Sequence, residues 1–191
     1  MTERTGAGSS RLPSVRIGAA VAVAIAIAFV AWFFIRENND SSSTPATTTS
    51  SIGPTGASQD RLRALAKEAG HPIYWAGAKN GMTYELTRTT NGRVFVRYLP
   101  SEVPVGIRQA EFTIVGTYPV PSALKVLREL AKKPGETTFP APHNGFAVYD
   151  KSHPTNVYVA YPGSDLQIEV FDPSAEHARE LITSGAVAPV G

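Results

Sequence analysis

The chain has 191 residues, which is enough for one ordinary domain together with accessory segments. Its 18 Lys+Arg and 16 Asp+Glu leave a net charge of +2 without a clustered basic stripe, which argues against a nucleic-acid-binding protein. The chain has no cysteine, so disulfides, thiolate metal sites and a thiol nucleophile are excluded.

An uncharged apolar stretch follows the tail formed by residues 1–16. Residues 17–35, IGAAVAVAIAIAFVAWFFI, carry no charged side chain. As a helix rising about 1.5 Å per residue, this stretch matches the hydrocarbon thickness of about 30 Å. We predict a single transmembrane helix. The alternative is a cleaved signal peptide, whose apolar region is normally shorter, about 7–15 residues, and ends at a small-residue cleavage site.

The charges that flank residues 17–35 predict the orientation of this helix. Three arginines lie before it, whereas residues 36–40 hold one arginine and two acidic residues. Because positive flanks stay on the cytoplasmic side, we expect a cytoplasmic N-terminus and a C-terminal domain outside the cell membrane.

A spacer follows at residues 36–57. It contains SSSTPATTTSS, in which nine of eleven residues are Ser or Thr, and it shows no apolar period. Such a segment cannot bury enough surface to offset its ordering entropy. We therefore predict a disordered, Ser/Thr-rich linker before a folded extracytoplasmic domain at residues 58–191.

The first half of this domain predicts one helix and four strands. SQDRLRALAKEAG, residues 58–70, places Leu62 and Leu65 on one helix face, and Gly70 is suited to end the helix. Short strands are expected at 73–75, 84–88, 94–99 and 112–117. Asn91-Gly92 predicts a hairpin between the second and third of these strands.

The second half repeats this order and adds a helix. PSALKVLRELAKKPG, residues 121–135, predicts a helix, and strands are expected at 137–139, 146–149, 157–161 and 166–171. DPSAEHARELITSG, residues 172–185, predicts a third helix with Asp172 as its N-cap and Pro173 at its first position. The expected fold class is α+β with an antiparallel sheet.

Three signals in the same order indicate an internal duplication. LRALAKEAG at 62–70 and LRELAKKPG at 127–135 share six of nine residues, and VFVRY at 94–98 resembles VYVAY at 157–161. Pro119 and Pro173 each stand just before a helix. We interpret residues 58–119 and 120–185 as two αββββ copies, the third helix closing the second copy. The alternative is chance, since Leu, Ala, Lys and Arg are common in helices.

Histidines and acids of the second half are the weak candidates for chemistry. His143, Asp150 and His153 could recruit a metal, but their spacing matches no standard ligand pattern. Ser164 and Asp165 in YPGSD could serve a hydrolase, although the same letters form tight turns. No motif identifies a catalytic residue or a cofactor.

Aromatic residues are the stronger candidates for binding. In GHPIYWAG, residues 70–77, we expect Tyr74 to be structural and Trp75, with His71 beside it, to be the part that could bind. Alternation along the strand at 94–99 places Phe95 and Arg97 on one face, where they could meet a partner.

The runs AGHPIYWAG, TYELTRTTNGRVFVRYLP and VYVAYPGSDLQIEVFDPS resemble an actinobacterial family of single-pass, membrane-anchored proteins with no named activity. The resemblance covers most of residues 58–191 and implies a location in the bacterial cell envelope. It implies no mechanism.

These observations lead us to expect a non-catalytic module, anchored by its own helix, that binds an envelope protein or ligand without a cofactor. The alternative that stays open is an envelope hydrolase or metal-dependent enzyme using loop His and Asp residues of the second half.

Overall fold

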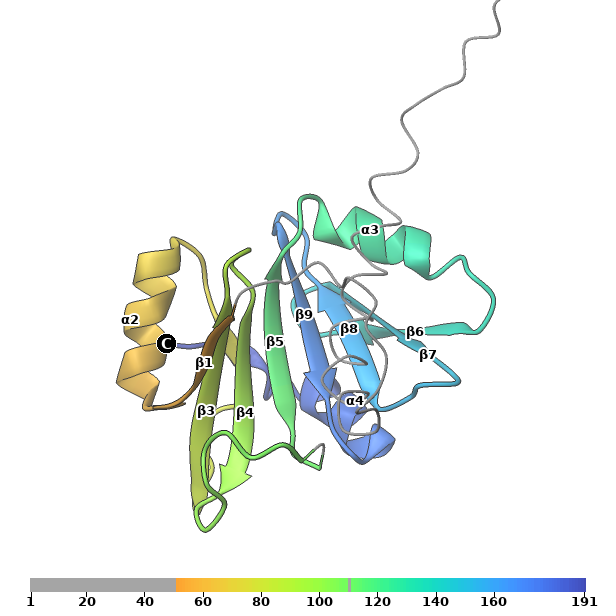
Figure 1. The fold of residues 1–191 in the computed structure, drawn as a ribbon. Coiled ribbons are helices and arrows are strands. Elements are labelled where there is room, and N and C mark those ends of the chain that lie inside the picture. Colours follow the sequence, from red (N-terminus) through yellow and green to blue (C-terminus); the bar gives the residue numbers. More distant parts are fainter. Residues whose placement is uncertain (1–50, 110) are drawn as a thin grey trace, which may run out of the picture.

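One antiparallel sheet of eight strands organises the residues that the computed structural model describes, 51–109 and 111–191 (Figure 1). The strand order is β1-β3-β4-β5-β9-β8-β7-β6, and three helices accompany the sheet. The predicted α+β class with an antiparallel sheet is therefore confirmed. The predicted tail, the transmembrane helix at 17–35 and the spacer before Ser51 lie outside the described residues. No helix within the described ranges combines the length and the apolarity needed to cross a membrane.

The predicted helices and strands occur in the predicted order, most of them with shifted ends, and β1 and β10 are strands that the sequence did not predict. The helices are α2 (Gln59–Ala69), α3 (Ala123–Leu130) and α4 (Ala175–Thr183). The sheet consists of β1 (Ser51–Ala57), β3 (Met82–Thr89), β4 (Val94–Pro100), β5 (Ile114–Pro119), β6 (Glu136–Ala141), β7 (Gly145–Asp150), β8 (Asn156–Ala160) and β9 (Leu166–Phe171). Two short strands, β2 (Tyr74–Trp75) and β10 (Ala188–Pro189), pair only with each other.

The end of the predicted spacer belongs to the sheet. Residues 51–57, expected to be disordered, form the edge strand β1, which pairs with β3 and is interrupted by a register shift between Ile52 and Thr55. An edge strand gains order from its backbone bonds to one neighbour, so it needs no apolar period of its own. The predicted start of the ordered domain at residue 58 is therefore wrong.

Strand β2 departs from the predicted four-stranded first copy. Tyr74 and Trp75 form a strand as expected, but they are buried against the sheet instead of extending its edge. The C-terminal strand β10 pairs with them, and the Val190 N–H donates to the Ile73 carbonyl at 2.8 Å. Two large aromatic side chains bury more area on the sheet face than at its edge, where β1 pairs with β3 instead.

The β3–β4 turn confirms the predicted hairpin with a longer loop. The Gly92 N–H donates to the Thr89 carbonyl at 3.1 Å, and Gly92 has a φ of 79°. This is a type I turn followed by a left-handed residue, for which glycine carries little steric penalty.

The N-cap of α4 is Ser174, not Asp172. Ser174 Oγ accepts a hydrogen bond from the His177 N–H at 3.3 Å. The Asp172 carboxylate accepts from the Ser174 N–H at 2.9 Å and lies 2.8 Å from His177 Nδ1. Both side chains stabilise the start of the helix, and Pro173 stands before its cap.

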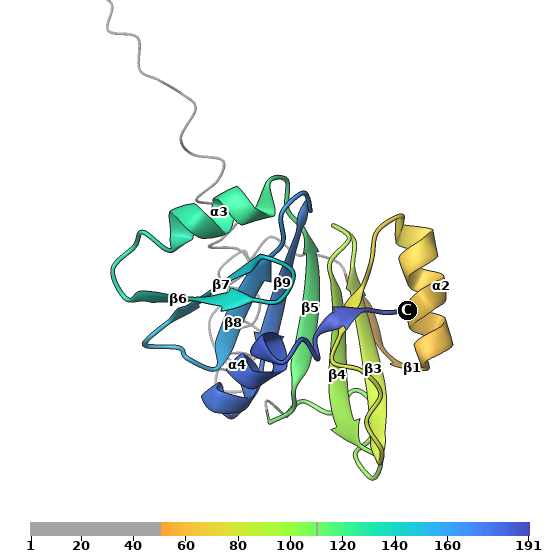
Figure 2. The same cartoon turned by 180° about the vertical axis from the view of Figure 1, so that it is seen from behind.

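The two sheet faces carry different cores. On the face that we call the α4 face, α2, α4, β2 and β10 pack on the sheet, and Figure 2 shows α4 and β10 in front of it. On the opposite face, which we call the α3 face, α3 packs on β7, β8 and β9. The main contributors to the α4 face are Leu62, Leu65, Ile73, Val96, Val115, Val159, Ile168, Leu181 and Ile182.

Six of the eight strands form two similar meanders, β3-β4-β5 and β7-β8-β9, and β1 and β6 are the edge strands. The two meanders meet where β5 pairs with β9, and Gly116 lies opposite Glu169 at this junction. The helices do not repeat this relation. Leu62 of α2 packs on the α4 face, whereas Leu127 of α3 packs on the α3 face, although the two helices have similar sequences.

Candidate functional site

The two aromatic residues of GHPIYWAG are part of the core. Trp75 is buried and lies edge-on to Tyr84, with ring centroids 5.6 Å apart. Tyr74, as expected, is buried and stacks on Tyr161 with centroids 5.8 Å apart. His71 is half-buried in the loop before β2, and its Nδ1 lies 3.0 Å from the Pro72 carbonyl oxygen. Trp75 and His71 therefore do not form an open site.

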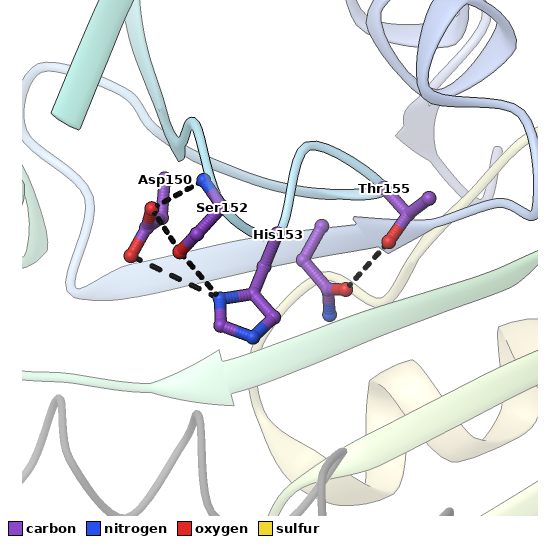
Figure 3. Close-up of polar contacts among 5 residues, drawn as sticks. Asp150, Ser152, His153 and Thr155 are labelled. Carbon is purple, nitrogen blue, oxygen red and sulfur yellow. Dashed lines mark hydrogen bonds and ion pairs between the residues drawn. The ribbon is translucent and has the colours of Figure 1, made fainter. Parts of the chain in front are cut away.

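Asp150 and His153 meet in the turn between β7 and β8, where Figure 3 shows them with Ser152. Asp150 Oδ1 accepts from the Ser152 N–H and hydroxyl, both at 2.7 Å, and Ser152 Oγ lies 3.0 Å from His153 Nδ1. The two Ser152 bonds lower the pKa of Asp150. Because the Ser152 hydroxyl and N–H both point to the carboxylate in a surface turn, the cluster is explained as an Asx turn.

His143 lies at the other end of β7, in the turn that joins β6 to β7. Six strand residues at about 3.3 Å each separate the two turns by roughly 20 Å. The predicted metal candidates therefore do not converge. Within the described residues, no group of three or more His, Asp or Glu side chains could hold a metal ion.

Ser164 and Asp165 stabilise the connections around α3. Asp165 Oδ1 accepts from the Ser122 N–H at 2.7 Å, and the Asp165 carbonyl accepts from the Val120 N–H at 2.7 Å. Ser164 Oγ accepts from the Leu166 N–H at 3.2 Å. Asp165 thus binds the backbone at the start of α3, where the Ser122 side chain makes no capping bond.

A buried ion pair crosses from β3 to β4 on the α3 face. Glu85 and Arg97 are directly opposite in the strand register, and Arg97 Nη1 lies 3.3 Å from Glu85 Oε1. The side chains are 3 % and 4 % exposed. We call these two residues the fork.

Residues 101–109 and 111–113, which we call the strap, lie between β4 and β5, and the strap passes across the lower ends of β3 and β4 in Figure 1. The Gly106 N–H donates to Glu85 Oε2 at 2.6 Å, and Arg97 Nη2 donates to the Ile107 carbonyl at 2.6 Å. The guanidinium also lies over the Phe112 ring, 5.3 Å from its centroid. The fork therefore binds the strap through neighbouring backbone groups.

Arg97 has two side-chain nitrogens that donate no hydrogen bond. Its Nε and Nη1 are buried and make no hydrogen bond, since the geometry of the ion pair with Glu85 does not align the Nη1 protons. Burial lowers the pKa of Arg97, and the Glu85 charge opposes that shift. A buried donor without an acceptor costs free energy. A ligand that supplied an acceptor to Arg97 Nε or Nη1 would remove this cost and would bind more tightly for that reason.

A second polar cluster surrounds Glu169 on β9. Its carboxylate accepts from the Tyr118 hydroxyl, and Oε1 accepts from Asn156 Nδ2 at 2.7 Å. Burial raises the pKa of Glu169, while these hydrogen bonds oppose the rise. Burial and the nearby carboxylate raise the pKa of Tyr118 and of Tyr158, so both phenols stay protonated as donors.

Gly116 makes the contact between Tyr118 and Glu169 possible. A Cβ at this position would lie 3.0 Å from Tyr118 Cε2 and Oη, because the Tyr118 ring crosses over the glycine to reach Glu169. Phe95 lies edge-on to the same ring, with centroids 5.5 Å apart, and Arg93 lies above it at 5.4 Å. Phe95 and Arg97 do share one face of β4, as predicted.

The sequence did not indicate Glu85, Asn156 or Glu169 as site residues. Gln167 and Glu169 alternate with apolar residues along β9, a pattern typical of a half-buried strand, but both are buried. They are buried because the α3 face is covered as well. The only signal was the polarity of these strand positions, which solvent exposure explains equally well in a sequence.

The chain matches no protein-family model, no curated protein and no solved structure. The chemistry of the fork and of the Glu169 cluster therefore rests on geometry. The fork has free donors for an oxygen acceptor, whereas the Glu169 carboxylate already receives hydrogen bonds on both oxygens.

Proposed function

We propose that this protein is a membrane-anchored binding module of the bacterial cell envelope, with its folded domain outside the cytoplasm. The single observation that carries the binding function is the fork, a buried guanidinium with two nitrogens that lack hydrogen bonds beside a carboxylate that accepts a backbone N–H. The apolar residues 17–35 and the asymmetry of their flanking charges support the anchor and its orientation.

The location is tested by cysteine labelling of the full chain in its membrane. Because the chain has no cysteine, Ser9→Cys and Thr90→Cys each introduce a unique thiol, and Thr90 is exposed at the β3–β4 turn. We expect a membrane-impermeant maleimide to label the Thr90→Cys chain in intact cells. The Ser9→Cys chain should react only after permeabilisation, and the reverse pattern would overturn the orientation.

The binding function is tested by capture from native membranes. Full chain carrying a C-terminal tag is cross-linked, solubilised and recovered. The amount of partner recovered with it is measured against increasing amounts of untagged chain. We expect saturable capture that the untagged chain competes away. Capture that does not saturate, or no capture at all, contradicts the proposed function.

We also infer that the two meanders descend from one duplicated unit. The strand order is symmetric about the β5–β9 junction, and VFVRY on β4 and VYVAY on β8 occupy corresponding places. The duplicated unit would be the three-stranded meander, because β2 lies outside the main sheet and the helices cover different faces. If sequences of relatives showed no similarity between the two meanders beyond chance, the duplication would be rejected.

A further inference from the structure

The fork recognises peptide backbone. Glu85 accepts from the N–H of Gly106, and Arg97 donates to the carbonyl of the next residue, Ile107. Neither bond involves a side chain of the strap. The strap makes these bonds from a turn, in which the Ile107 N–H donates to the Pro104 carbonyl at 3.4 Å and Gly106 has a φ of +89°. A peptide segment that formed the same turn could make the same two bonds.

The strap contributes few buried side chains to its own attachment. Between residues 101 and 109, only Val103 and Ile107 are half-buried, and the other side chains are exposed. Gly106 has a φ of +89° and lies near Pro54 of β1. Segments with few buried apolar contacts open at low free-energy cost, so the two fork bonds account for much of what holds the middle of the strap.

We propose that the fork is a peptide-binding site and that the strap occupies it as an internal ligand. This inference rests on the proposed binding function and names its partner, a peptide segment that forms the same turn as the strap. The strap leaves Arg97 Nε and Nη1 without hydrogen bonds. A partner segment that supplies one more oxygen acceptor can therefore displace the strap, despite the high effective concentration of a tethered competitor.

The sheet edges are poorer sites for the same partner. Strand β1 carries Pro54 within its register shift, and β6 carries Pro140. Proline has no N–H to donate, so neither edge can pair fully with an added strand. On the α3 face of the second half, Leu127 and Leu130 hold α3 by apolar packing, which offers a peptide no backbone partner.

The test uses the peptide VPVGIRQ, the sequence of residues 103–109, added to full chain in detergent. Gly106→Ala loosens the strap without altering the fork, because alanine is strained at a φ of +89° and the nearest atom to its Cβ is 3.8 Å away. We expect the peptide to bind the Gly106→Ala chain at least about tenfold more tightly than the unaltered chain, as removal of a competing internal ligand requires.

The fork is removed by Glu85→Met/Arg97→Met in the Gly106→Ala background. Replacing both members of a buried pair by apolar side chains is often neutral for folding, and circular dichroism verifies that the fold is kept. We expect this chain to lose peptide binding. Glu129→Met/Lys132→Met, which removes an exposed ion pair on α3, is the matched control and should bind as the Gly106→Ala chain does.

Three outcomes would overturn the inference: equal binding to the Gly106→Ala and unaltered chains, binding that survives loss of the fork, or no binding at millimolar peptide. The proposed function has its own test, which is capture from native membranes. If a membrane partner is captured equally by the unaltered and Glu85→Met/Arg97→Met chains, the protein binds elsewhere and only the inference about the fork is wrong.

Discussion

The two meanders of the sheet share a strand plan but differ in what covers their α3 face. Over β7, β8 and β9, α3 packs Ala123, Leu127 and Leu130 on an apolar surface. Over β3 and β4, the strap is held by Glu85 and Arg97 through its backbone. Apolar packing is non-directional and keeps water out, whereas the fork bonds are directional and can be exchanged for equivalent groups. In one half of the sheet the cover, α3, is fixed by apolar packing. In the other half the cover, the strap, is held by hydrogen bonds that another segment could make in its place.

Arg97→Met should have the largest effect, because it leaves Glu85 buried without its cation. Removing one member of a buried pair typically costs about 3–5 kcal/mol, and Glu85 keeps only its bond from Gly106. Urea denaturation measures the loss. The double variant Glu85→Met/Arg97→Met should recover most of it, and a double variant no more stable than the single one would show that the strap depends on Arg97 for packing instead.

Leu127→Ala tests the apolar cover of the other half. Leu127 is fully buried between α3 and the sheet, and such a truncation costs about 3 kcal/mol through lost burial and a residual cavity. Thermal denaturation should show the loss. Leu124→Ala on the same helix is the control, since Leu124 is only half-buried and should cost clearly less. Equal losses would mean that α3 is not anchored on the side that its packing indicates.

The sequence predicted the strands well because apolar alternation and turn residues are local signals. Asn91-Gly92 located the β3–β4 turn, and the strand at 166–171 was predicted at its observed ends. Strand β1 was missed because a Ser/Thr-rich edge strand depends on pairing with β3, a contact made across about thirty residues of chain.

The candidate site was less accessible to sequence reasoning. Phe95 and Arg97 were recognised because they share one face of one strand. Their partners come from other strands: Glu85 of β3 pairs with Arg97, and Tyr118 of β5 contacts Phe95. Tyr118 in turn donates to Glu169 of β9. Pairing of β4 with its neighbours brings these groups together, and a single sequence shows neither the register nor the cover that buries them.

Gly116→Ala probes the junction between the halves. The added Cβ would meet the Tyr118 ring at 3.0 Å, so the ring must move and the Glu169 carboxylate loses a donor. We expect a loss of about 1–3 kcal/mol in urea denaturation, the cost of an unsatisfied buried polar group. Gly56→Ala on β1 is the matched control, because its Cβ would meet nothing closer than 3.9 Å. A Gly116→Ala chain as stable as the control would show that Tyr118 is free to shift.

The pH dependence of stability should also report on this junction. Burial raises the pKa of Glu169. The folded carboxyl therefore keeps its proton at pH values at which the unfolded carboxyl, with a pKa of about 4.3, has lost it. The folded state then binds more protons, and stability falls as the pH rises from that value to the raised pKa. Urea denaturation across this range should show a shallower fall for Glu169→Gln than for the unaltered chain. Parallel profiles would contradict the assignment to Glu169.

Val105→Ser should have the smallest effect and bears most directly on the difference between the halves. Val105 is an exposed strap residue next to Gly106, and surface substitutions usually stay within about 0.5 kcal/mol. Near-neutral stability in urea denaturation is expected because the fork holds this part of the strap through Gly106 N–H and the Ile107 carbonyl, which the substitution leaves in place. A loss above about 1.5 kcal/mol, the range of a well-buried side chain, would show that the strap is attached by apolar packing as α3 is. The two halves would then be covered by the same means, and the reason for regarding the strap as exchangeable would be lost.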